Sequence, residues 1–454
     1  MKLTYSFSLI LSLSLGWTPF LAAKQLVSDA TIAMQKQNTE IFELPGKVPV
    51  VYRRIEGTEI VQIATAMAYG EAHVPAATQP ALSVLFELMK RGTKTWPKDK
   101  LYALVEKYAA SVSCGVSIET SACSMATLEE YLPELLPVYA SVMQEPAFDP
   151  TEGQLILQQA EASLKSMTQN PEAYVNEVVN GAFYGGSHPY WVPNEKELEY
   201  LKKLKLSDLP ALHADVMKKS RKVIVVVAGM PKDKLQKILT QHLGQLTQGT
   251  SELKAPPSPK FNAKRVFALA DRDIPTAYVR AKFSLPPYTS PDTPAVNLLM
   301  RILSEELESE VRTKRSLSYA VFAQPVSLAM GIGVIHASTS HPKETLEAIA
   351  PVVKKLRDEK LSKEDLERHK TVFATGYFLT LEEHSSLASA LASSYLYNGN
   401  IERLYQTPRE LEKVTPEDIQ RIARQYFKEF RLGVVFKEKS FQKTWADGFL
   451  KALN

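Results

Sequence analysis

An arginine and a tyrosine seven residues apart could together hold a peptide backbone and an oxyanion. Arg312 ends a predicted helix whose apolar residues recur every three or four positions from Ala295. Tyr319 lies in the alternating, β-prone run that follows, so we expect it on a strand. A guanidinium offers a planar fork of donors to carbonyls or a carboxylate, and a phenol can donate to an oxygen that becomes negative during acyl transfer. The competing interpretation is structural: Arg312 pairs with Glu308 one turn earlier, and Tyr319 is half-buried in a sheet.

The residues around this pair resemble a family signature. Residues 307–319, Leu-Glu-Ser-Glu-Val-Arg-Thr-Lys-Arg-Ser-Leu-Ser-Tyr, are similar to the second-domain signature of the pitrilysin/insulinase-type metallopeptidases, which include the mitochondrial processing peptidases. In that family an Arg and a Tyr at this spacing bind substrate and stabilise the transition state. The resemblance therefore implies these roles for Arg312 and Tyr319. The family often has Gly before the Leu, where this chain has Ser316.

The resemblance does not extend to the metal site. Working members of the family carry His-x-x-Glu-His on a first-domain helix, where the two histidines bind zinc and the glutamate takes a proton from the metal-bound water. The landmark Lys-Arg-Gly-Thr at residues 90–93 follows that helix and fixes the alignment. It places Ser83 and Glu87 at the histidine positions, Phe86 at the general base, and Gln159 at the third ligand. We therefore expect no metal in this chain and zinc in a partner chain.

Composition indicates a globular protein of two or more domains. The chain has 454 residues, of which 45% are hydrophobic and 23% are charged. A net charge of +4 without a polybasic run argues against nucleic acid as a partner.

The N-terminus is typical of an export signal. Lys2 precedes an apolar stretch at residues 7–17, and small residues at 21–23 offer a cleavage point before Lys24. We expect residues 1–23 to be a signal peptide, either cleaved or kept as an anchor. No later stretch is apolar for long enough to span a membrane. A bacterial periplasm is the expected location.

The chain repeats its pattern with a period a little over two hundred residues. In each half a strand precedes a helix that opens near a proline, then come a hairpin, long helices, and a closing helix and strand. The pattern predicts an α+β fold of two similar α/β-sandwich domains, residues 24–247 and 264–454, with a proline-rich linker at 248–263. The resemblance implies that the two domains form a clamshell, with substrate held between them.

Both cysteines, Cys114 and Cys123, fall in the first predicted hairpin. An oxidising compartment permits a disulfide between them. Facing positions require a tight turn at Ile118 and Glu119, which lacks the usual Gly or Asn. The sequence leaves two interpretations open, a disulfide or two buried thiols.

These observations favour a non-catalytic, substrate-binding subunit of a heteromeric, exported zinc peptidase. Its homologous partner would carry the zinc, and the substrate would be a peptide or unfolded polypeptide. Alone, the chain would not hydrolyse peptides. The alternative is a peptide- or protein-binding assembly module with no proteolytic role. A self-sufficient peptidase with an unusual metal site is the least supported hypothesis, because none of the eight histidines lies four residues from another.

Overall fold

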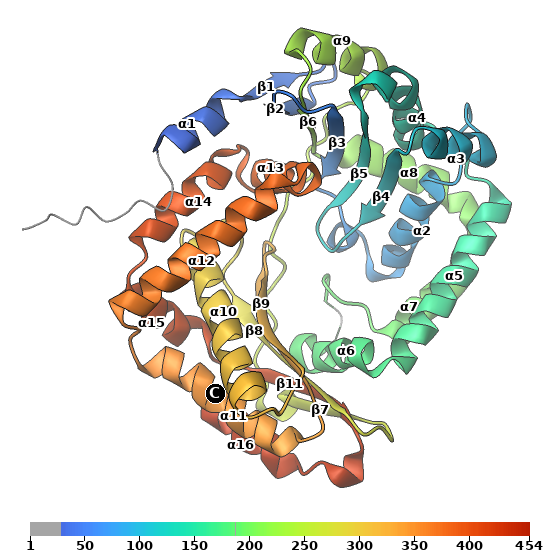
Figure 1. The fold of residues 1–454 in the computed structure, drawn as a ribbon. Coiled ribbons are helices and arrows are strands. Elements are labelled where there is room, and N and C mark those ends of the chain that lie inside the picture. The colour runs from blue at the N-terminus through green and yellow to red at the C-terminus, as the bar shows by residue number, and fades with distance from the viewer. Residues whose placement is uncertain (1–28, 187) are drawn as a thin grey trace, which may run out of the picture.

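Two lobes face each other, each built on one mixed β-sheet with helices on both faces (Figure 1). The computed structural model describes residues 29–186 and 188–454, so the expected signal peptide at 1–23 lies outside the described residues. Within those ranges, no helix combines the length and the apolarity that a membrane crossing needs.

The two sheets share one topology. The first has the strand order β1-β2-β6-β3-β5-β4, and the second has the order β7-β11-β8-β10-β9. In each sheet one neighbouring pair is parallel, β2 with β6 and β7 with β11, while the other neighbours are antiparallel. The predicted repeat is therefore confirmed, with β1 as an addition to the first copy. The strands are β1 (Thr39–Glu43), β2 (Pro49–Arg54), β3 (Ile60–Met67), β4 (Ser111–Val116), β5 (Ser121–Leu128), β6 (Lys222–Ala228), β7 (Phe267–Asp271), β8 (Ala277–Leu285), β9 (Ala320–Val326), β10 (Gly331–Thr339) and β11 (Arg431–Phe436).

The helices begin where the sequence supplies caps and prolines. Asp149 and Asn170 each accept two backbone N–H bonds at the start of a helix, and a proline follows each of them. The helices are α1 (Asp29–Gln37), α2 (Gln79–Met89), α3 (Lys98–Lys107), α4 (Leu132–Gln144), α5 (Pro150–Gln169), α6 (Pro171–Tyr184), α7 (Asn194–Lys203), α8 (Leu209–Lys219), α9 (Lys232–Leu243), α10 (Thr293–Leu307), α11 (Pro342–Asp358), α12 (Lys363–Glu382), α13 (His384–Asn398), α14 (Glu402–Lys413), α15 (Pro416–Tyr426) and α16 (Lys443–Leu453).

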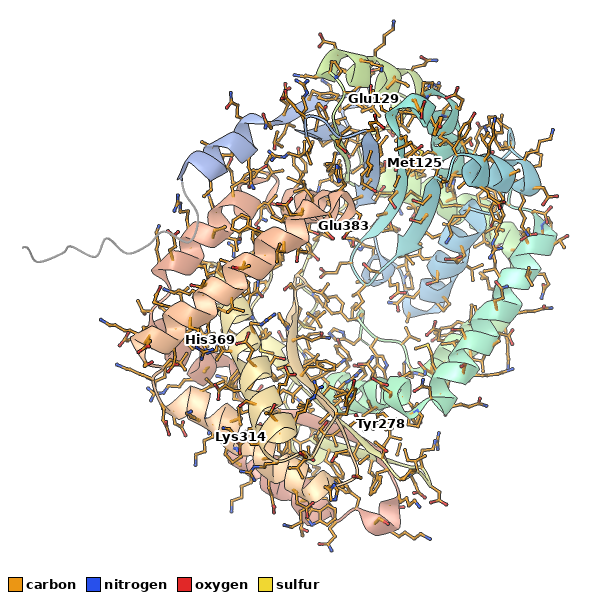
Figure 2. All side chains as sticks on the ribbon, in the orientation of Figure 1. Met125, Glu129, Tyr278, Lys314, His369 and Glu383 are labelled. Atoms are coloured by element: carbon orange, nitrogen blue, oxygen red, sulfur yellow. A yellow bond between two sulfur atoms is a disulfide. The ribbon has the colours of Figure 1, made fainter. Side chains whose placement is uncertain are left out.

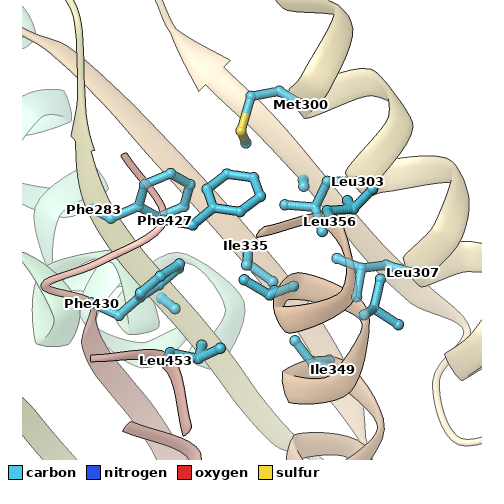
Figure 3. Packing of buried hydrophobic residues seen from close by; sticks show 14 of the residues in the cluster. Phe283, Met300, Leu303, Leu307, Ile335, Ile349, Leu356, Phe427, Phe430 and Leu453 are labelled. Carbon is cyan, nitrogen blue, oxygen red and sulfur yellow. The ribbon is translucent and has the colours of Figure 1, made fainter. Parts of the chain in front are cut away.

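Each lobe has its own apolar core between its sheet and its own helices. In the second lobe, Phe283 of β8 packs edge-on against Phe427 and tilted against Phe430, with ring centroids 5.4 and 4.5 Å apart (Figure 3). Leucines of α10 and α11 close the other side of this cluster. Burial of this apolar area is the main favourable term that holds the lobe together.

The lobes also exchange one helix each. Helix α6 of the first half packs on β8 and β11 of the second sheet, while α13 of the second half packs on β3 and β6 of the first. The two backbones approach closely at Gly433 of β11, where an added Cβ would meet the backbone of Val179 of α6 at 2.6 Å. Leu387 and Leu391 of α13 join valines of the first sheet in a separate buried cluster. Each sheet therefore depends on the other half of the chain for one of its covers.

A buried carboxylate joins the two hairpins. Glu119, at the turn between β4 and β5, is 2% exposed. Both of its carboxylate oxygens accept from the Ala329 backbone N–H, at 3.0 Å, in the turn between β9 and β10. The hydroxyls of Tyr190 and of Tyr397 on α13 also donate to it. Burial, together with this carboxylate, raises the pKa of both phenols.

Cys114 and Cys123 lie opposite each other on β4 and β5, and a disulfide joins them. The tight turn that this pairing requires is present, since the Ser117 N–H donates to the Thr120 carbonyl at 2.7 Å. Its central residues have negative φ, so this turn needs no glycine.

Candidate functional site

Arg312 and Tyr319 form one exposed pair on the second lobe. The Arg312 guanidinium carbon lies 4.9 Å from the centroid of the Tyr319 ring, within cation–π range. Arg312 Nη1 also lies 3.0 Å from Glu308 Oε1. Tyr319 is 84% exposed, so its phenol reaches solvent. The ion pair of the structural interpretation is present, but its half-buried tyrosine is wrong.

The backbone around the pair is irregular. Helix α10 ends at Leu307 and passes into a π-helical turn, Glu308–Lys314. π-helical turns are frequent at functional sites. The N–H groups of Ser316 and Leu317 donate back to the carbonyls of Arg312 and Val311, which closes the turn.

The expectation that Tyr319 lies on a strand is wrong by one residue. Strand β9 begins at Ala320, whose partner on β10 is Ser338. The Ser318 hydroxyl donates to the carbonyls of both residues, at 2.9 and 2.7 Å. This side-chain hydrogen bond therefore takes the place of the first backbone hydrogen bond between β9 and β10, and the Tyr319 side chain can project into solvent.

Ser316 occupies a position that favours glycine. Its φ is +53°, in the left-handed region, and it stands where the resembled family often has Gly. We expect Ser316→Gly to stabilise the protein by about 0.5–1 kcal/mol, because relief of the left-handed strain outweighs the added freedom of the unfolded chain. Urea unfolding measures this difference, and Ser309→Gly, inside the helical turn, is the control that should destabilise instead. A loss of stability in Ser316→Gly would contradict the assignment.

The four degenerate zinc positions do not form a metal site. Phe86 is 1% exposed and belongs to the first-lobe core. Glu87 pairs with Lys90 at 2.8 Å, while Gln159 is exposed on α5. Ser83 is only half-buried on α2, and its hydroxyl offers a poor ligand for zinc. Across residues 29–186 and 188–454, no three His, Cys, Asp or Glu side chains gather closely enough to hold a metal ion.

The two halves of the resembled active site lie on different lobes. The turn bearing Arg312 packs on α10, α11 and β9, all in the second lobe. Lys314 marks this turn in Figure 2, while Met125 and Glu129 mark β5 and the residues after it on the first lobe. The helix with the degenerate positions, α2, packs on β4, α5, α7 and α8 of the first lobe.

A cavity that the sequence did not predict lies between the lobes. Its volume is about 380 Å³, and residues of both lobes line it. Burial raises the pKa of Glu197 to about 7, with help from Glu71 and Glu177. Burial lowers the pKa of Lys282 on β8 to about 7, and neighbouring Arg280 adds to the effect. These residues are spread over more than two hundred positions, so no local pattern could have revealed them.

Glu197 makes the stability of the protein depend on pH. Because its folded-state pKa is raised, the bound proton stabilises the fold at low pH, and this contribution is lost as the pH rises from about 4.5 through 7. After allowance for its partial exposure, Glu197→Gln should stabilise the protein by about 1–2 kcal/mol at pH 8 and by much less at pH 5. Urea unfolding at both pH values, with the exposed Glu199→Gln of the same helix as control, checks this. Equal effects at both pH values would contradict it.

Two family models match this chain. "Insulinase (Peptidase family M16)" matches residues 56–189, and "Peptidase M16 inactive domain" matches residues 203–373. The zinc protease PqqE of Helicobacter pylori is 22% identical over 261 residues, which cover 55% of this chain and 58% of that protein. The match thus spans a little over half the length of that relative. The uncharacterized zinc protease ML0855 of Mycobacterium leprae is 20% identical, over 84% of this chain and 88% of its own length.

Solved structures share the fold. A peptidase M16 inactive domain from Pseudomonas fluorescens superposes with a TM-score of 0.79 at 18% identity, over 88% of this chain and 98% of that one. A protease from Helicobacter pylori gives 0.76 at 19% identity, over 88% and 99% of the two chains. The periplasmic protease PqqL from Escherichia coli gives 0.73 at 14% identity, over 88% of this chain and 46% of that one. The predicted α+β clamshell is confirmed, and the chain belongs to the insulinase-type peptidase family M16.

Proposed function

We propose that this protein is the non-catalytic, substrate-binding subunit of a heteromeric, exported zinc peptidase. A homologous partner that carries His-x-x-Glu-His would hold the zinc and the general base. Arg312 and Tyr319 would reach into the partner's active site. The substrate would be a peptide or an unfolded polypeptide, and a bacterial periplasm the place of action.

The observation that carries the proposal is the exposed Arg312–Tyr319 pair. A tyrosine that is 84% exposed, with a guanidinium over its ring, contributes little to its own lobe and is available to another chain. The degenerate zinc positions support the same assignment, because Phe86 fills the core where a general base would be needed.

The pair would act by position and charge. The Arg312 guanidinium would donate to substrate backbone carbonyls or to a carboxylate near the scissile bond. The Tyr319 hydroxyl would donate to the oxyanion of the tetrahedral intermediate, where a fixed donor is most effective. The metal chemistry belongs to the partner chain in this proposal.

Co-purification from the native host tests the proposal. The tagged chain should bring down an M16 relative with the complete zinc motif, and the complex should contain zinc and cleave unfolded polypeptides. The chain purified alone should contain no stoichiometric zinc and should leave the same substrates intact. Tightly bound zinc in the isolated chain would refute the proposal. Recovery of a complex without zinc or peptidase activity would favour the assembly-module alternative.

A further inference from the structure

The cavity between the lobes has walls of opposite charge. Glu71, Glu177 and Glu197 line it from the first lobe, while Arg280 and Lys282 line it from β8 of the second. In the part of the chain that the structure describes, none of these five side chains forms an ion pair with another residue. Buried charges are costly without a partner. Both walls therefore carry charge that the protein itself does not neutralise by direct contact.

The cationic wall has hydrogen-bond donors to spare. Lys282 is 7% exposed, and its ammonium donates to the Asn180 side-chain oxygen at 2.5 Å, which uses one of three donors. The Nε of Arg280 is buried without a hydrogen-bond partner, and its Nη2 lies 3.3 Å from His336 Nδ1. An anion in the cavity would offer acceptors to the remaining Lys282 donors and would neutralise part of the Arg280 charge.

The repeat in the chain provides an internal control. Lys282 pairs with Arg431, and Arg280 pairs with Gly433, on the sheet face that α6 covers. In the first sheet the corresponding strands pair Ala66 with Val223 and Ala64 with Val225, and this face packs against α13. The first lobe thus builds the same sheet face from apolar residues. The fold does not need cations there, so their presence requires another reason.

The rest of the lining suits a peptide. Four side-chain amides line the cavity, and each can both donate and accept, as peptide groups do: Gln79, Asn176, Asn180 and Gln324. Tyr184 and Trp191 add aromatic surface. A volume of about 380 Å³ lies at the small end of the range for ligand sites.

We propose that this cavity binds a short peptide of about two or three residues with both termini free. Its carboxylate would lie against Arg280 and Lys282, and its ammonium group against Glu71 and Glu197. The opposite charges of the walls would fix its direction. The site belongs to this chain alone and does not depend on Arg312, Tyr319 or any partner, so it can succeed or fail independently of the proposed function.

Calorimetric titration of the purified chain with trialanine tests the site. We expect saturable one-site binding that weakens about ten- to hundredfold when the peptide is N-acetylated, and similarly when it is amidated at its C-terminus. These blocked peptides test both ends without altering the protein. Absence of saturation up to ~10 mM trialanine, or equal affinity for any blocked peptide, would overturn the proposal.

Two variants assign the ends. Lys282→Met should weaken trialanine binding about tenfold or more, while its unfolding midpoint stays the same or rises, because methionine is buried without loss of charge hydration. The same substitution at the exposed Lys165 of α5 is the control and should change neither value. Glu197→Gln should reduce the discrimination between trialanine and its N-acetyl form. Full discrimination in Glu197→Gln, or full affinity in a folded Lys282→Met, would contradict the assignment.

Discussion

Tyr319→Phe is expected to lower turnover of the proposed zinc-bearing complex by about 10²–10³-fold, the usual cost of removing one oxyanion donor. Within residues 29–186 and 188–454 the phenol hydroxyl makes no hydrogen bond that supports its own lobe, and Tyr319 is 84% exposed. Stability and assembly should therefore stay unchanged while the rate falls. Arg312→Ala should reduce turnover as well, because the substrate loses its fork of donors and Tyr319 loses the cation over its ring. Steady-state assays with one peptide substrate measure both effects.

Arg315→Ala is the matched control for this experiment. Arg315 is a nearby exposed arginine that pairs with Glu310, and the proposal gives it no contact with substrate. Removal of the Arg315 side chain should change turnover by less than about twofold relative to the unsubstituted complex, as expected for an exposed ion pair. Unchanged turnover in both Tyr319→Phe and Arg312→Ala, within an intact complex, would reduce the pair to a surface feature.

Glu119→Ala is expected to destabilise the protein by about 3–5 kcal/mol, because it leaves several buried donors without their acceptor. The carboxylate accepts from the Ala329 N–H and from the hydroxyls of Tyr190 and Tyr397. The Ala329 N–H and the Tyr397 hydroxyl belong to the second half of the chain, so the loss also loosens the contact between the lobes. Urea unfolding followed by circular dichroism measures the change.

The exposed Glu134→Ala on α4 is the control for Glu119, with an expected change within about 0.5 kcal/mol. The loss of stability in Glu119→Gln should lie between those of Glu119→Ala and Glu134→Ala. An amide keeps one acceptor oxygen but adds a donor that faces other donors. A Glu119→Ala variant as stable as Glu134→Ala would show that the buried bonds add nothing to the fold.

Local sequence patterns predicted much of the fold, but they did not predict which helices pack on the sheet of the opposite lobe. Helix α15 is the closing helix that the pattern of the second half predicts. It spans Pro416–Tyr426, because a capping Thr415 precedes a proline and a regular apolar stripe follows. The exchanged helices α6 and α13 were not predicted. The small and polar residues of α13 give a weak periodic signal, and its leucines are buried only because the first sheet, more than 150 residues earlier, accepts them.

The site shows the same division. Family resemblance selected Arg312 and Tyr319, and the structure places them in contact. From the sequence, Glu119 is only an unfavourable residue for a tight turn. No local pattern indicates that the tip of this hairpin contacts Ala329, 210 positions away. The strand prediction for Tyr319 failed because a hydrogen bond from the Ser318 hydroxyl takes the place of a backbone hydrogen bond between the strands. β-propensity does not account for such side-chain bonds.

The exchange of α6 and α13 has a consequence for biogenesis. While the chain is being synthesised, the first sheet presents an uncovered face of valine and alanine until residues 384–398 have emerged. Such an apolar surface favours aggregation until α13 covers it. Division of the chain between the two lobes would leave each fragment with one uncovered apolar sheet face, so neither half is expected to stay soluble without the other.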